Sequence, residues 1–401
     1  MKRLFLFILL IMITTPIPGC TLITGEETYE LDEILIDTDF ERMLGYVPYS
    51  FLEENEVWFI NFGKAKEMYK IEDITSIEDA KNLPDDRLVA IRNALTETGS
   101  FIPVWRNKEL SPLIGFDGMA TDRIIMIGVV PPKIFSILEG DFDEELITDL
   151  LTGQGYTKMD YGSYSYYSIR GDYQMEMTHP LAQMVLAAMN RLAVLDDMII
   201  VSPATEYVTG IFDAMAGDIP SITDNDACLA LADSLGDVFA AVMTTPEMTV
   251  FAFPQAEEEI RFDFTIPEDW GLLHRYEMSA LGYRAEGEKR FLVIALYYAN
   301  EEDARADGAE IVKRMGDYIL GTYHERMENI PFTEQYQPGE PVVQQYLEGF
   351  VLSIECELIP EGRLGAAFHM GGMGVPRDML FLIPDPSIYV GKSQEQEIIV
   401  R

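Results

Sequence analysis

The sequence predicts an α+β protein of two domains, each a small sheet with helices packed on one face. Apolar runs of strand length alternate with amphipathic helical patterns along the chain. Hydrophobic residues make up 48% of the composition, which excludes a disordered chain, and 401 residues are more than one hydrophobic core usually organises. A proline and three consecutive glutamates interrupt the apolar pattern around Pro254 to Arg261. We therefore expect an N-terminal domain at 28–253 and a C-terminal domain at 262–401.

Residues 1–20 have the features of an export signal. Lys2 and Arg3 form a positive start, and residues 4–13 carry no polar side chain, which is the length of a signal-peptide core and about half of what a bilayer span needs. The tetrapeptide Ile17-Pro18-Gly19-Cys20 follows and resembles the lipobox of bacterial lipoproteins. The resemblance implies that Cys20 is acylated and becomes the mature N-terminus, with residues 21–27 as a short tether. The alternative is an ordinary secretory signal with an incidental cysteine.

The N-terminal domain is expected to alternate strands with helices that lie across them. Residues 124–130 form an unbroken apolar run ended by two prolines, which is typical of a strand buried on both faces. Asp141 and Glu144 form a pair of capping-box type, with Gly153 as the stop, so these carboxylates predict a helix start and not a metal site. The other patterns predict helices near 40–44, 84–99, 180–189, 204–216 and 224–235, and strands at 57–60, within 192–201 and at 238–243.

Residues 156–169 predict a β-hairpin that turns near Tyr161 and Gly162. Its second arm carries Tyr164, Tyr166 and Tyr167, and tyrosine suits a half-buried strand. The alternative is a stacking platform for sugar rings or for another protein, because tyrosine combines an apolar ring with a polar tip.

The C-terminal domain is expected to combine a hairpin, a helix and late strands. Residues 276–284 and 291–298 predict an antiparallel pair that turns at Gly287. Asn300 is placed to cap the next helix, whose first turn is acidic. Further strands are predicted at 350–358 and 379–383. Because both halves share a strand, an acidic-capped helix and another strand, ferredoxin-like layers would fit each of them.

The chain is strongly acidic. Its 68 Asp and Glu residues outnumber 29 Lys and Arg residues, which gives a formal net charge of −39. Such a surface repels the phosphates of nucleic acids and of anionic lipids, so no nucleic acid is expected as a partner. The simpler explanation of the acidity is solubility in a crowded or saline envelope, and an acidic binding face is the alternative.

Besides Cys20 the chain contains two cysteines, Cys228 and Cys356. The first lies in an apolar helical pattern and the second in a strand pattern, where a free cysteine is commonly a small buried hydrophobic residue. Export would permit a disulfide between them, but we expect two free thiols.

No motif of a known catalytic class is present. The chain lacks the G-x-S-x-G elbow, the H-E-x-x-H zinc motif and the phosphate-binding glycine loops, and its histidines, His179, His274, His324 and His369, are scattered. We therefore assign no catalytic residue, cofactor or metal ligand, and Cys20 is the residue with a definite chemical role.

One metal hypothesis remains, because thioethers and imidazoles suit Cu(I). The residues concerned form two short clusters: Met175, Met177 and His179, and His369, Met370 and Met373. Against copper, a chain with 21 methionines produces such neighbours by chance, and methionine commonly fills cores.

These observations favour a lipid-anchored protein of the cell membrane or outer membrane, on the extracytoplasmic side, that binds or scaffolds without catalysis. A lipobox before acidic α+β domains is similar to acidic cell-envelope lipoproteins of bacteria. The expected partners are the membrane, through the N-terminal lipid, and an envelope protein or carbohydrate. Two alternatives stay open: a hydrolase of envelope polysaccharide or peptide, which needs two carboxylates facing across a groove, and a solute-binding receptor, which needs a large cleft between domains.

Overall fold

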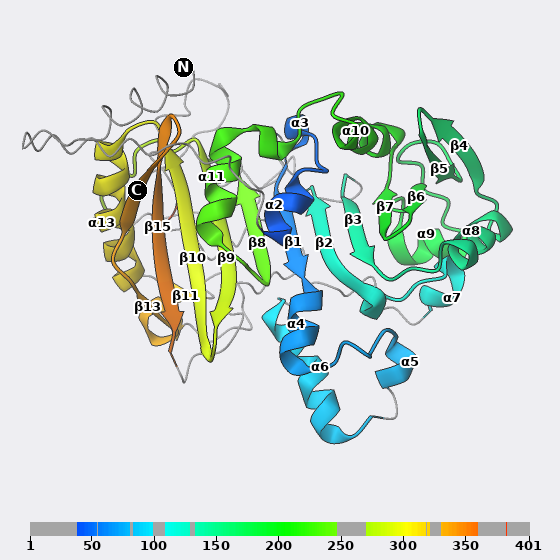
Figure 1. Cartoon of the computed structure of the whole chain (residues 1–401), viewed down its shortest axis with the longest axis horizontal. Helices are drawn as coiled ribbons and strands as arrows, with labels where there is room; N and C mark the ends of the chain where they lie inside the picture. The colour runs from blue at the N-terminus through cyan, green and yellow to red at the C-terminus, as the bar shows by residue number, and fades with distance from the viewer. Residues whose placement is uncertain are drawn as a thin grey trace, which may run out of the picture. The chain divides into compact units, whose positions relative to one another are not determined.

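The computed structural model describes residues 38–53, 55–80, 83–98, 109–128, 133–246, 270–317, 319–320, 330–359 and 382. The described part is a mixed α+β structure in which antiparallel strands form a 13-stranded sheet (Figure 1). Its longer helices are α2 (Asp39–Leu44), α4 (Phe62–Tyr69), α6 (Asp85–Glu97), α8 (Glu144–Gly153), α9 (Pro180–Val185), α10 (Thr205–Met215), α11 (Asp226–Leu235) and α13 (Glu301–Asp317). Shorter ones are α3 (Tyr49–Leu52), α5 (Ile77–Ala80), α7 (Ser111–Ile114), η1 (Gly118–Ala120), η2 (Ile222–Asp224) and η3 (Phe332–Glu334).

The strands of the large sheet follow the order β13-β15-β10-β9-β8-β1-β2-β3-β7-β6-β5-β4, and β14 pairs with β15 beside this path. Their bounds are β1 (Val57–Asn61), β2 (Thr121–Ile127), β3 (Phe135–Gly140), β4 (Thr157–Tyr161), β5 (Tyr164–Ser168), β6 (Arg191–Leu195), β7 (Met198–Ser202), β8 (Ala240–Thr244), β9 (Met278–Glu286), β10 (Lys289–Tyr298), β13 (Tyr336–Pro338), β14 (Val342–Tyr346) and β15 (Gly349–Leu358). A separate pair joins β11 (Ile319–Leu320) to β12 (Ile330–Pro331).

The prediction of two small sheets, each with ferredoxin-like layers, is wrong. Strand β8 pairs with β1 on one side and with β9 on the other, so one sheet contains the strands of both predicted halves. The cause lies in burial: β8 is buried along its whole length, and a strand buried in this way needs a neighbour on each side. The predicted boundary at 254–261 lies outside the described residues.

Helices cover both faces of the sheet, not one face as predicted. Alternate side chains of β1 point to opposite faces, so Val57 and Phe59 enter one core and Trp58 and Ile60 the other. We name the faces by their helices. The α4 face packs against α4, α6, α8, α9 and α13, and the α10 face packs against α2, α3, α10 and α11. Because helices cover both faces of the sheet, side chains on both sides of these strands are buried, which explains why so many strands are continuous apolar runs in the sequence.

Most of the individual elements match their predicted positions. Both hairpins form, with Gly162 and Gly287 at positive φ in their turns. The cap of α8 differs from the prediction, because Asp143, and not Asp141, accepts a hydrogen bond from the amide of Leu146 (2.9 Å). The acidic residues there cap a helix, as predicted. Among the described residues, no helix is long and apolar enough to cross a bilayer.

Close packing at the centre of the sheet gives a test of its continuity. Gly282 of β9 pairs with Ala241 of β8, and a Cβ atom at Gly282 would lie 2.9 Å from Cγ1 of Val238 and 3.1 Å from Cδ2 of Leu235. Both neighbours are fully buried. We expect Gly282→Ala to lower the free energy of unfolding by about 1–3 kcal/mol, because the core must shift to admit the methyl group.

The matched control is Gly316→Ala in α13, where the added Cβ meets no atom within 4 Å. That variant should be more stable by about 0.5–1 kcal/mol, since alanine favours a helix over glycine. Urea unfolding measures both variants. Equal stability of the two would contradict the close packing of Leu235 and Val238 against Gly282 of β9.

Candidate functional site

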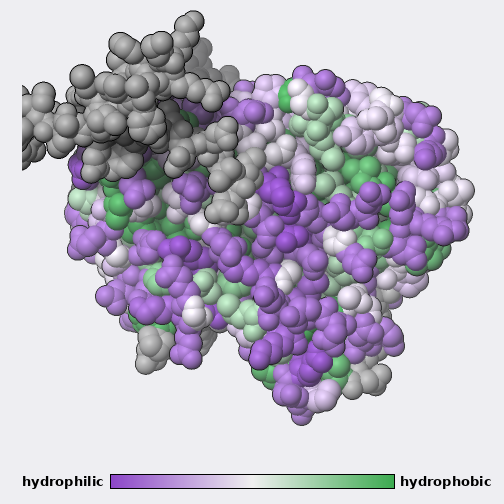
Figure 2. All heavy atoms as spheres, in the orientation of Figure 1, coloured by the Kyte–Doolittle hydropathy of each residue, from purple (hydrophilic) through white to green (hydrophobic). Residues whose placement is uncertain are grey.

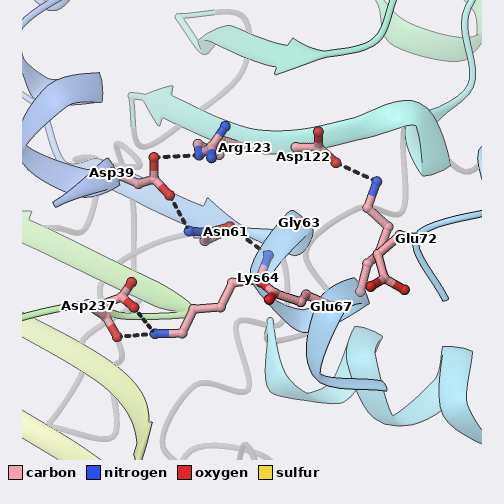
Figure 3. A pocket seen from close by; sticks show the side chains of 10 residues that line it. Asp39, Asn61, Gly63, Lys64, Glu67, Glu72, Asp122, Arg123 and Asp237 are labelled. Carbon is pink, nitrogen blue, oxygen red and sulfur yellow. Dashed lines mark hydrogen bonds and ion pairs between the residues drawn. The ribbon is translucent and has the colours of Figure 1, made fainter. Parts of the chain in front are cut away.

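The candidate site is a polar cavity of about 520 Å³ where β1 ends and α4 begins (Figure 3). Its walls come from α2, the end of β1, α4, the start of β2 and the segment before β8. Hydrophilic side chains cover the region of α2 and α4 on the face that Figure 2 shows. The lining residues are Asp39, Asn61, Gly63, Lys64, Lys66, Glu67, Glu72, Asp122, Arg123 and Asp237.

Asn61 fixes the floor of the cavity. It is the last residue of β1 and is buried, and its side chain bonds in two directions. Oδ1 accepts a hydrogen bond from the amide of Lys64 (2.9 Å), which caps α4, and Nδ2 donates to Oδ2 of Asp39 (2.9 Å). One buried amide therefore holds the start of α4 and the start of α2 at the same point.

A charge network forms the wall on the α2 side. Nε of Arg123 lies 2.7 Å from Oδ1 of Asp39, and both Nη atoms of Arg42 donate to the buried carboxylate of Glu139. Burial would raise the pKa of Asp39, but the hydrogen bonds and charges of Arg123 and Arg42 outweigh it, so the pKa lies below its usual value. The hydrogen bond that Arg42 donates to Glu139 raises the pKa of Arg42, although burial alone would lower it. Asp39 and Arg42 are therefore charged at neutral pH.

Two lysines of α4 complete the fixed charges. Nζ of Lys64 lies 2.6 Å from Oδ2 of Asp237, and Nζ of Lys66 lies 2.5 Å from Oδ1 of Asp122. Only 5% of the Lys66 side chain is exposed, and its Nζ also donates to the carbonyl of Met119 (3.3 Å). Each ammonium additionally lies over an aromatic ring, that of Phe239 for Lys64 and that of Phe62 for Lys66. The basic groups of the cavity are thus fixed in position by carboxylates and rings.

Glu67 and Glu72 differ from the other carboxylates of the cavity. Both are exposed, and neither forms an ion pair with any residue that the structure describes. The lining contains five carboxylates and three basic side chains, so its formal charge is −2. Since the basic groups already have acidic partners, the cavity attracts a positively charged ligand.

The structure locates some of the residues that the sequence singled out. Cys20 lies outside the described residues. Met175 and Met177 are exposed, and Nδ1 of His179 accepts a hydrogen bond from the amide of Leu181 (3.3 Å), so this histidine caps α9. The second half of the copper hypothesis, residues 369–373, lies outside the described residues. Among those that are described, no three His, Cys, Asp or Glu residues come together as a metal site.

The tyrosines of the hairpin pack mainly as structural residues. Tyr164 stacks on Phe212 of α10 with ring centroids 4.6 Å apart, and Tyr166 is 7% exposed in the core of the α10 face. Tyr167 packs against the opposite core. Their rings are therefore divided between two faces and do not form one stacking platform.

The two described cysteines are free and buried, as expected. Cys228 packs in the core of the α10 face and Cys356 in that of the α4 face, so the sheet separates them. Burial raises the pKa of the Cys228 thiol, and it raises that of Cys356 to about 12. Neither thiol is a nucleophile at neutral pH.

Sequence patterns did not identify the cavity. Its residues extend from Asp39 to Asp237, and the sheet brings them together only because β1 lies between β2 and β8. The available signal was the polar residue at each strand end: Asn61 follows an apolar run, and Asp122 with Arg123 precedes another.

Comparison with known proteins does not identify a family for this chain. No family model matches the chain, and no curated protein does. Crystal form III of TP0453 aligns with 78% of this chain and 93% of its own, at 8% identity and a TM-score of 0.31. Crystal form IV of the same protein aligns with 76% and 92%, at 9% identity and a TM-score of 0.30. Likeness at this level supports no conclusion about the chain.

The charge network predicts a pH dependence. Because the pKa of Asp39 is lowered in the folded state, its contribution is present above the unfolded value of about 3.9 and is lost as pH falls through the folded value. We expect Asp39→Asn to lower the free energy of unfolding at pH 7 by about 1 kcal/mol. The difference from wild type should shrink on acidification to about pH 3.

The matched control is Asp149→Asn on α8, an exposed residue that forms no ion pair with the described residues. It should have little effect at either pH. Urea titrations at the two pH values measure both variants. A decrease in the free energy of unfolding of Asp39→Asn that is the same at pH 7 and pH 3 would contradict the stabilising role of the charged Asp39 carboxylate.

Proposed function

We propose that this chain is a lipid-anchored, non-catalytic binding protein on the extracytoplasmic side of the envelope, with a cationic ligand in the cavity at the start of α4. One observation carries the ligand assignment. Lys64, Lys66 and Arg123 each form an ion pair with a carboxylate, whereas Glu67 and Glu72 form no ion pair with a basic residue of the described chain. The anchor rests on the lipobox-like tetrapeptide that ends at Cys20.

The ligand class follows from the groups that remain available. An ammonium group can donate hydrogen bonds to the carboxylates of Glu67 and Glu72, and such charge-assisted bonds are stronger than neutral ones. Hydroxyl or amine groups elsewhere on the ligand can donate to Asp122 or Asp237, which the lysines hold in place. A volume of about 520 Å³ suits a small organic molecule. An amino sugar or an oligoamine fits this description.

The ligand assignment can be tested with spermidine and glucosamine by calorimetric titration of the full-length chain. We expect wild type to bind at least one of them, and Glu67→Gln with Glu72→Gln to weaken binding about tenfold or more, because two charge-assisted contacts are lost. Neutral glucose should bind more weakly than glucosamine.

The control variant combines Glu145→Gln with Glu288→Gln. It changes the net charge equally, but both residues are exposed and do not line the cavity. It should bind as wild type does. If neither amine binds to wild type, the ligand proposal fails. If both double variants weaken binding equally, it also fails, because the effect then comes from the net charge of the chain and not from the cavity.

The anchor has a separate test. In a bacterial host, Cys20→Ser should abolish incorporation of labelled fatty acid and block maturation, because the resemblance assigns the diacylglyceryl thioether to that sulfur. Two or more acyl chains are what stable anchoring requires. If the mature wild-type protein begins at a residue other than Cys20, or carries no acyl group on Cys20, the anchor proposal fails and ordinary secretion replaces it. Either result leaves the ligand test unaffected.

The two rival functions have less in their favour. A hydrolase needs an acid with a raised pKa across a groove from a second carboxylate. Burial raises the pKa of Asp307, but this residue lies on α13, outside the cavity, and is bonded to His274 and Tyr298. A solute receptor was expected to hold its ligand between two domains, and the pairing of β8 with β9 places the two predicted halves in one sheet.

A further inference from the structure

The strand β4 presents a free edge in the part of the chain that the structure describes. It ends the order of the large sheet and pairs on one side only, with β5. All five of its residues, Thr157 to Tyr161, are exposed. Strand edges of this kind expose unpaired backbone donors and acceptors and can pair with another strand.

Side chains of β4 divide between the two faces of the sheet. Met159 and Tyr161 lie opposite Tyr166 and Tyr164, and the ring of Tyr161 also contacts Phe212, so both are on the α10 face. Lys158 and Asp160 are on the α4 face. Neither forms an ion pair with any described residue.

We propose that β4 pairs with β4 of a second copy of this chain, antiparallel and centred on Met159. In this register Met159 lies opposite its own symmetry mate, and Lys158 of each copy lies opposite Asp160 of the other, on the same face. Thr157 lies opposite Tyr161. The sequence Thr-Lys-Met-Asp-Tyr is therefore self-complementary in charge about its centre.

The charge pattern of β4 favours a second copy of this chain as the strand that pairs with its free edge. A lone lysine on an edge strand normally discourages pairing, because it faces an unmatched neighbour. Here the two-fold axis supplies a carboxylate to each Lys158, and two ion pairs form for one strand contact. Pairing also covers Met159 and Tyr161, which are 43% and 37% exposed. The interface is small, so we expect a weak, concentration-dependent dimer that extends the sheet across two chains.

Charge reversal tests the pairing in the purified full-length chain, by sedimentation velocity over a concentration series. Lys158→Asp alone, or Asp160→Lys alone, places like charges opposite each other twice and should weaken the dimer about tenfold or more. The double variant Lys158→Asp with Asp160→Lys restores two opposite-charge pairs and should dimerise as wild type does. Lys133→Asp, exposed and on the loop before β3, is the control for net charge.

A register test uses cysteine. Met159→Cys should form an intermolecular disulfide under mild oxidation, since it faces its own symmetry mate, whereas Asp160→Cys faces Lys158 and should form far less.

Restored dimerisation in the double variant Lys158→Asp with Asp160→Lys shows that the single charge-reversal variants did not simply misfold. A wild-type chain that stays monomeric at every concentration would overturn the proposal. So would a dimer that the charge reversals leave unchanged, or one that cross-links equally at positions 159 and 160.

Discussion

The position of β1 between β8 and β2 is the constraint on which the other features depend. Every residue of this strand is buried, and its side chains enter two cores on opposite faces of the sheet. Its hydrogen bonds to β8 join the early part of the chain to β9, β10 and β15, and those to β2 join it to the β3–β7 region. The chain leaves β1 at Asn61 and turns directly into α4, because the Asn61 side chain caps the first turn of that helix. That turn places two lysines of α4 beside the acidic residues of neighbouring segments.

The cavity is thus a consequence of how the central strand ends. A buried strand end leaves backbone and side-chain polar groups that need partners. Asn61 supplies them for α2 and α4, and the ion pairs of Lys64, Lys66 and Arg123 neutralise the charges that the strand ends bring together. Glu67 and Glu72 are not needed for this balance. The difference between the carboxylates that hold the structure and those that are free to bind is the physical basis of the proposed function.

Local sequence patterns predicted much of the secondary structure but not the arrangement of the sheet. The runs at 57–60 and 291–298 became β1 and β10, and the turn at Gly287 formed as its flanking strands required. Periodicity shows which faces of a segment are apolar, but it does not show which strand lies beside it. For that reason the pairing of β8 with β9 was missed and one sheet was predicted as two. Single polar residues at strand ends, such as Asn61, give no periodic signal, so the cavity could be found only once β1, β2 and β8 were in place.

The most direct test of the account is a crystal structure of the full-length chain grown with a saturating concentration of spermidine or glucosamine, whichever amine binds more tightly in solution. We predict an amine nitrogen of the ligand within hydrogen-bond distance of the carboxylates of Glu67 and Glu72, while the ion pairs Lys64–Asp237 and Lys66–Asp122 stay intact. An empty cavity under these conditions, or a ligand that breaks the lysine pairs to reach Asp122 and Asp237, would contradict it.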